Sequence, residues 1–150
     1  MIDMRNNKGM TLIELLAALS ILAIVSGLVY GVLVGANNNY NRLSSKAELS
    51  REANLILSTI KNYHEQTAKT PGNPNAEYEI NVVSGQYVIG EKNNASTPLH
   101  SQNAIIEIRR NEILITGKET ISSLAHLPIK ITAKDKNGQA YEVDTIIRRY

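Results

Sequence analysis

The feature that most constrains this chain is a long apolar run near its amino terminus. From Leu15 to Ala36 the chain carries no charge over 22 residues, and 20 of the 27 residues from Met10 to Ala36 are apolar. A helix rises about 1.5 Å per residue, so the uncharged run would extend roughly 33 Å and cross the hydrocarbon core of a bilayer. The run therefore predicts a membrane-spanning helix.

A cleaved secretory signal is the alternative interpretation of this run. Arg5 and Lys8 form a basic segment before it, and Val34-Gly35-Ala36 offers small residues at a cleavage position. However, the apolar core of such signals is typically about 7–15 residues long, which is shorter than this run. Charge alone leaves the orientation of the span open, because basic residues lie close to both of its ends.

Glu14 is the one acidic residue within the apolar stretch that begins at Met10. An ionisable group at the centre of a bilayer costs about 2.5–3.5 kcal/mol on insertion scales unless it finds a partner or reaches the interface. Glu14 either marks the headgroup boundary or has a partner of opposite charge. The residues alone leave both readings open.

The segment Lys8-Gly9-Met10-Thr11-Leu12-Ile13-Glu14, continued by apolar residues to Leu19, resembles the processing signal of type IV prepilins and type II secretion pseudopilins. In that family a prepilin peptidase cuts after the glycine, and the new amino terminus is methylated. The resemblance implies cleavage after Gly9, with Lys8 in the recognised dipeptide, and N-methylation of Met10. The family usually has Phe at the position of Met10.

The resemblance also implies a role for Glu14 and a topology for the chain. In the family, an acid at this place docks the terminal amine of a neighbouring subunit during assembly. The leader lies in the cytoplasm and the carboxyl-terminal domain outside the cytoplasmic membrane. The implied partners are the prepilin peptidase, other pilin or pseudopilin subunits through the amino-terminal helix, the inner-membrane assembly platform and membrane lipid.

After the apolar run, two apolar stripes recur at helical spacing. One consists of Tyr40, Leu43 and Ala47, and the other of Leu49, Ala53, Ile56, Ile60 and Tyr63. They predict an amphipathic helix to about Ala68, which the segment 70–74, containing two prolines and a glycine, ends.

Beyond this helix the periodicity changes from helical to alternating, which predicts six short strands. Ser84-Gly85 joins the segments 78–82 and 86–89, Arg110-Asn111 joins 104–109 and 112–116, and Asn137-Gly138 lies between 128–133 and 140–146. We expect a loop from Gly90 to Pro98. The predicted fold class is α+β: a long pilin-like spine helix, transmembrane and then amphipathic, packed on a small antiparallel sheet. The predicted regions are a leader (1–9), a transmembrane and assembly half-helix (10–36), an amphipathic half-helix (37–70) and an extracellular β domain (71–150).

Enzymatic or metal chemistry has little support in the sequence. There is no Cys, and the three histidines, His64, His100 and His126, are widely separated and form no ligand motif. The turn from Asp135 to Gly138 lacks the later ligands of a calcium loop, so a hairpin is the better interpretation. We therefore expect a non-enzymatic protein without cofactor or metal.

Nucleic acid is the remaining candidate ligand, because the family includes DNA-uptake pili. Arg109, Arg110, Arg148 and Arg149 are the candidate DNA contacts. Residues 37–150 carry 14 basic and 12 acidic groups, so composition alone gives no basic patch.

The function predicted from the sequence is a structural subunit of a type IV pilus-like, type II secretion or competence filament. Many pilins of the family carry a carboxyl-terminal disulfide loop, and the absence of Cys favours a minor pilin or a pseudopilin. The alternative is a membrane-anchored extracellular binding domain that does not polymerise.

Overall fold

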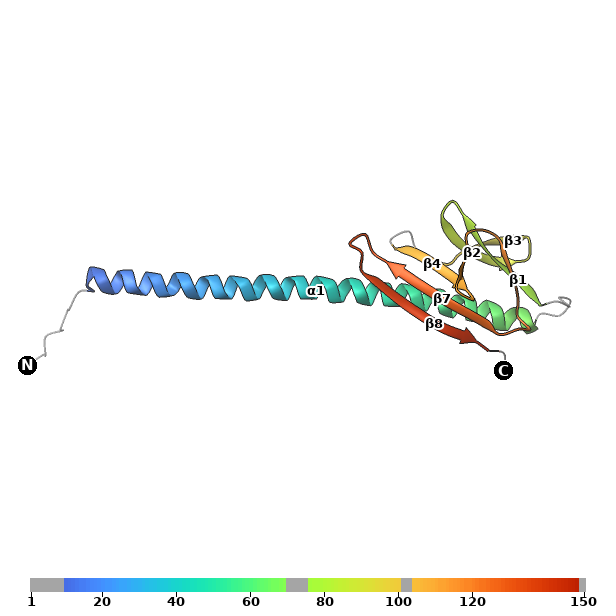
Figure 1. Ribbon diagram of the computed structural model, residues 1–150, viewed down its shortest axis with the longest axis horizontal. Coiled ribbons are helices and arrows are strands. Elements are labelled where there is room, and N and C mark those ends of the chain that lie inside the picture. Colours follow the sequence, from blue (N-terminus) through green and yellow to red (C-terminus); the bar gives the residue numbers. More distant parts are fainter. Residues whose placement is uncertain (1–9, 70–75, 101–103, 149–150) are drawn as a thin grey trace, which may run out of the picture. The chain divides into compact units, whose positions relative to one another are not determined.

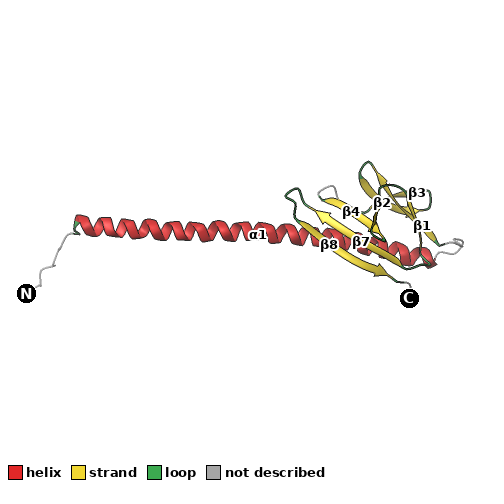
Figure 2. Cartoon of the chain, viewed as in Figure 1, coloured by secondary structure: helices red, strands yellow, loops and turns green. Residues whose placement is uncertain are grey.

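The structure is a computed structural model that describes residues 10–69, 76–100 and 104–148. These residues form one long helix followed by eight strands in two antiparallel sheets (Figure 2). The α+β, pilin-like fold class predicted from the sequence is therefore confirmed. The elements are α1 (Leu12–Lys69), β1 (Glu77–Val83), β2 (Gln86–Glu91), β3 (Asn94–Pro98), β4 (Ile105–Arg110), β5 (Ile113–Leu114), β6 (Glu119–Ser122), β7 (Leu127–Lys134) and β8 (Ala140–Ile147).

The chain divides into two compact units between Arg42 and Leu43. In the first unit the described residues form α1 as far as Arg42, and every side chain from Met10 to Arg42 is exposed. No proline interrupts the helix there, and its only interior charge is Glu14 in the first turn. α1 is the one helix in the described residues that is long and apolar enough to cross a membrane by length and composition.

The second unit contains the rest of α1 and both sheets, and Figure 1 labels α1 and six of the strands, β1, β2, β3, β4, β7 and β8. Sheet A has the strand order β3-β2-β1-β6, and sheet B has the order β5-β4-β7-β8. Each sheet is built on a hairpin of neighbouring strands. The turn between β1 and β2 has positive φ at Ser84 and Gly85, as a two-residue hairpin turn requires.

The core of this unit forms where one face of α1 meets the sheets. The helix residues Leu49, Ala53, Ile56 and Ile60 are spaced by three or four, so they lie on one side of the helix, and all four are buried. Buried residues alternate with partly exposed ones along β4 and the first half of β7, whereas β1 and β2 bury runs of consecutive residues. The largest fully buried apolar side chains of the strands are Tyr78, Ile80, Ile89, Ile108, Ile121, Leu127, Ile129 and Ile131.

A tyrosine side chain joins the two sheets across this core. The hydroxyl of Tyr87, on β2, donates a hydrogen bond of 2.9 Å to the carbonyl oxygen of Ile115. The same hydroxyl accepts a hydrogen bond of 3.2 Å from the backbone N–H of Ile108, on β4. Both bonds are buried, so they hold sheet A to sheet B where water cannot compete.

Three details of the sequence prediction are wrong. The segment from Gly90 to Pro98 is not a loop, because Asn94–Pro98 forms β3 and pairs with β2. The sheet is not single: the hairpins fall into two sheets, and β6, which the periodicity missed, pairs with β1. Of the two helical stripes, the first is exposed, with Tyr40 and Leu43 both 73% accessible, and the second supplies the buried face.

Candidate processing and assembly site

The first turn of α1 is closed by Thr11 and Glu14. The backbone N–H of Thr11 donates a hydrogen bond of 2.8 Å to Oε2 of Glu14, and the Thr11 hydroxyl donates one of 2.9 Å to the same oxygen. In return, the N–H of Glu14 donates to the Thr11 hydroxyl at 3.3 Å. This is the reciprocal capping box of a Thr followed three residues later by Glu, and it satisfies donors that a helix start leaves unpaired.

The capping box places a carboxylate at the positive end of the helix dipole, next to Met10. Both bonds from Thr11 end on Oε2, so Oε1 keeps its full capacity to accept a further donor. The sequence predicts a role for Glu14, and the capping role of Thr11 was not predicted. The Thr-x-x-Glu spacing ahead of an apolar run is the signal that identifies Thr11 as the helix cap.

The predicted processing residues lie at the edge of what the structure describes. Met10 precedes the helix, and its side chain is 71% accessible. Lys8 and Gly9 lie outside the described residues. The structure thus places the acid and the predicted new amino terminus in one short segment.

The helix surface that follows is apolar and uncovered. Leu12, Leu22 and Val32 are 79%, 62% and 72% accessible, and none of the residues in the apolar window of α1 is buried. Soluble proteins rarely expose so large a continuous apolar surface, and such surfaces mark membrane or protein contacts. Ser20 is a polar residue in this stretch, and its hydroxyl donates a hydrogen bond of 2.8 Å to the carbonyl oxygen of Leu16. The bond satisfies the hydroxyl within the helix, as a polar group in an apolar environment requires.

Two of the candidate DNA-contact arginines, Arg109 and Arg110, already take part in ion pairs. Arg109 and Arg110 are neighbours on β4, so their side chains leave opposite faces of sheet B. Arg109 bonds to Glu107 at 3.2 Å, and Arg110 bonds to Glu119, on β6, at 2.7 Å. Each of the two arginines thus has a carboxylate partner, and Arg109 shares Glu107 with Lys134.

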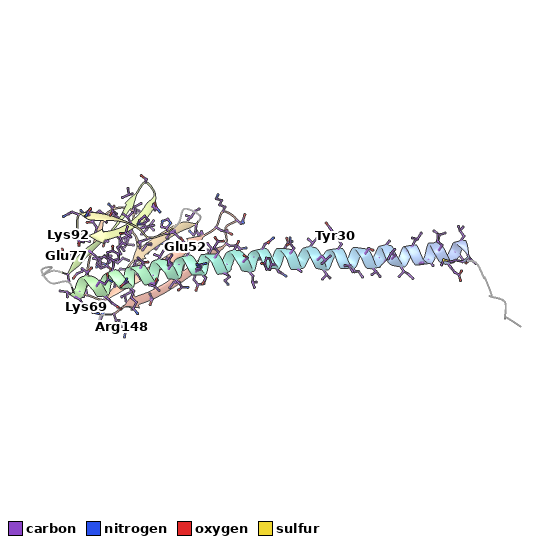
Figure 3. The ribbon with its side chains drawn as sticks, turned by 180° about the vertical axis from the view of Figure 1, so that it is seen from behind. Tyr30, Glu52, Lys69, Glu77, Lys92 and Arg148 are labelled. Carbon is purple, nitrogen blue, oxygen red and sulfur yellow. The ribbon has the colours of Figure 1, made fainter. Side chains whose placement is uncertain are left out.

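Arg148 follows the last residue of β8 and is exposed (Figure 3), while Arg149 lies outside the described residues. The predicted DNA contact at these arginines stays a prediction. A groove of about 360 Å³ next to Arg110, lined by Asn111 and the segment 113–119, adds only one further cation, Lys118. That lysine pairs with Glu79 at 3.1 Å.

The three histidines have different surroundings in the structure. His64 is buried in the core and lies 3.2 Å from the hydroxyl of Tyr78, whereas His126 is exposed. His100 accepts a hydrogen bond from the backbone N–H of Tyr87 at 3.3 Å. Among the described residues, no group of three or more His, Cys, Asp or Glu side chains is placed to hold a metal ion.

Comparison with known proteins identifies the amino-terminal segment. Residues 4–30 match the family model of the prokaryotic N-terminal methylation motif, which is the prepilin-type signature, so the resemblance seen in the sequence is confirmed. Neither the curated proteins nor the solved structures give a match to the chain. The motif implies processing by a prepilin peptidase, assembly with other pilin subunits and membrane anchoring, and it belongs to structural rather than catalytic proteins.

Proposed function

We propose that this protein is a non-enzymatic structural subunit, a minor pilin or pseudopilin, of a type IV pilus-like, type II secretion or competence filament. The observation that carries the proposal is the methylation motif at residues 4–30, which overlaps the start of α1, an apolar helix whose side chains are all exposed up to Arg42. A prepilin peptidase cuts after Gly9 and the new amino terminus, Met10, is methylated. The absence of Cys favours the minor or pseudopilin assignment.

The proposed membrane topology follows from the same motif. Residues 1–9 lie in the cytoplasm, α1 crosses the cytoplasmic membrane once from Met10 to about Ala36, and the chain from residue 71 onward lies outside. After assembly, the outer part of the chain lies on a cell-surface filament. The exposed apolar surface of α1 contacts lipid before assembly and neighbouring subunits afterwards.

Glu14 has the central role in assembly. Cleavage creates an amine on Met10 at the edge of the bilayer, where an unpaired charge of either sign is costly. A carboxylate and an amine offset each other's desolvation when they pair there. We assign Oε2 of Glu14 to the helix cap with Thr11 and Oε1 to the amine of a neighbouring subunit, so that the two contacts coexist.

The test is Glu14→Ala, with Glu48→Ala as the matched control, because Glu48 is an exposed acid on the same helix. Both variants should be cleaved by the prepilin peptidase, since the cleavage dipeptide is intact. Glu14→Ala should lose at least about tenfold in the amount recovered in sheared filaments, as expected for an uncompensated charge, whereas Glu48→Ala should keep the wild-type amount.

Normal recovery of Glu14→Ala in filaments would show that Glu14 has no assembly role. The wild-type chain could also be processed and yet stay in the membrane fraction when the other genes of the filament are expressed. That result would favour the alternative function, a membrane-anchored binding domain that does not polymerise.

A further inference from the structure

Sheet B ends in a long and regular open edge. β8 is its outermost strand, has eight residues, and pairs with β7 without a register shift (Figure 1). The other edge strands are blunted in ways that prevent further pairing: β5 has two residues, β6 has four, and β3 ends in Pro98 beside a register shift. Only β8, among the described strands, presents an unblunted edge.

The backbone groups on this edge follow from the β7–β8 turn. The N–H of Asp135 donates to the carbonyl oxygen of Gln139 at 2.9 Å, so these residues face each other as a hydrogen-bonded pair. Bonded and non-bonded pairs alternate along an antiparallel ladder. Tyr141, Val143 and Thr145 therefore bond to β7, and the N–H and C=O groups of alternate residues, among them Glu142 and Asp144, point away from the sheet.

The side chains of β8 have two different faces. Glu142 and Asp144 lie on the outer face and are exposed, and Glu142 bonds to Lys130 at 2.9 Å. Tyr141 and Val143 lie on the core face but are only half-buried, although the residues paired with them on β7, Ala133 and Ile131, are fully buried. The edge thus offers a partly uncovered apolar strip on one side and, on the other, two carboxylates, Glu142 and Asp144, that share the ammonium group of Lys130.

This charge argues against a second copy as the occupant. When two β8 strands pair antiparallel and centred on Val143, Glu142 of one faces Asp144 of the other. Like charges directly opposite each other destabilise a strand pair. A strand with basic side chains at these positions gains instead, and its remaining side chains cover Tyr141 and Val143.

We propose that the edge of β8 binds an extended segment of another polypeptide, one in which basic and apolar residues alternate, as an additional antiparallel strand of sheet B. Its basic side chains lie opposite Glu142 and Asp144, and its apolar side chains extend the core face. The proposal is independent of filament assembly, because it concerns only the second unit.

The probe is the synthetic peptide acetyl-Lys-Val-Lys-Thr-Lys-Val-Lys-amide, added to the full-length protein in a non-ionic detergent. We expect saturable binding by isothermal titration calorimetry, and slower amide hydrogen exchange at Glu142 and Asp144. The control peptide has the same sequence with the backbone nitrogens of its lysines methylated. It keeps the charge and loses the N–H donors, so it should bind about tenfold more weakly or worse.

Two variants separate backbone pairing from charge. Asp144→Pro removes the carboxylate and an outward-facing N–H, while the hydrogen bonds between β8 and β7 stay intact, so it should weaken peptide binding about tenfold. Asp144→Ala removes only the carboxylate and should weaken peptide binding about threefold. Equal binding of the two peptides to the unmodified protein, or exchange protection outside β8, would overturn the proposal. Equal binding of the unmethylated peptide by Asp144→Pro and Asp144→Ala would also overturn the proposal.

Discussion

The imidazole of His64 is a titratable group buried in the core of the second unit. It lies against Tyr78 of β1 in an edge-to-face arrangement, with Nδ1 3.2 Å from the tyrosine hydroxyl. Burial lowers the pKa of His64 below its ordinary value, and the nearby Ala125 backbone and Glu65 carboxylate offset part of this shift. The neutral form therefore belongs to the folded state.

This pKa shift predicts acid sensitivity. The unfolded chain takes up a proton on His64 near its ordinary pKa of about 6.5, before the folded chain does, so the free energy of unfolding should fall as the pH drops below about 6.5. His64→Gln should reduce this fall, and His126→Gln, at an exposed position, should leave it unchanged. Urea unfolding of the full chain in detergent, followed by tyrosine near-ultraviolet circular dichroism at about pH 7.5 and about pH 5.5, measures it. A pH response of His64→Gln equal to that of wild type would refute the assignment.

Single residues at the amino terminus of α1 were the most predictable part of the site. Glu14 could be identified because an acid in an apolar run is costly, and Thr11 had a spacing signal that was not used. The burial of His64 also had a spacing signal, because His64 follows Ile60 by four residues on the buried stripe of α1, but its partner had none. Its neighbour Tyr78 comes from β1, and only the fold brings the two side chains together.

At the scale of elements, the buried stripe of α1 supports the second unit. Ile56 is fully buried, and Ile56→Ala should lower the free energy of unfolding by about 2–5 kcal/mol through lost burial and a cavity. Leu55, one position away, is 55% accessible, so Leu55→Ala should cost less than about 1 kcal/mol. Urea midpoints of the two variants measure the difference, and similar values would place the core on another face of the helix.

The pairing of β2 with β3 requires a glycine at position 90, because the backbone of β3 comes very close to it. A Cβ at Gly90 would lie 2.7 Å from Cα of Ala95 and 2.8 Å from the carbonyl oxygen of Asn94, and both are backbone atoms that cannot yield easily. Gly90→Ala should therefore destabilise the unit by about 1–3 kcal/mol. Gly117→Ala, where nothing lies within 4 Å, is the matched control and should be near neutral by thermal unfolding. Equal melting temperatures would contradict the close approach.

The elements themselves were predicted unevenly. The helix and the three hairpins follow from local patterns, such as the apolar spacing of Ile56 and Ile60 and the turn residues Asn137-Gly138. The sequence predicts a loop at β3 because Asn94 to Pro98 has little strand propensity, and the strand conformation comes from pairing with β2. The division into two sheets was unpredictable as well, since β6 pairs with β1, some forty residues earlier, and the sequence pattern carries no such long-range information.

At the scale of the whole molecule, the chain consists of two units with unlike surfaces. The first exposes a continuous apolar helix, and the second buries its apolar residues between helix and sheets and exposes charge. The net charge of +2 gives no hint of this division. In our proposal the first unit contacts lipid and neighbouring subunits, and the second unit lies outside the cell.

The account depends most on processing of the amino terminus, which intact-mass spectrometry tests directly. The full chain is expressed in a cell together with an active prepilin peptidase and extracted from the membrane. We predict a mature protein that begins at Met10 and carries one additional methyl group on its amine. A chain that keeps Met1 beside an active peptidase, or one that begins at Asn37 after signal-peptide cleavage, would contradict the account.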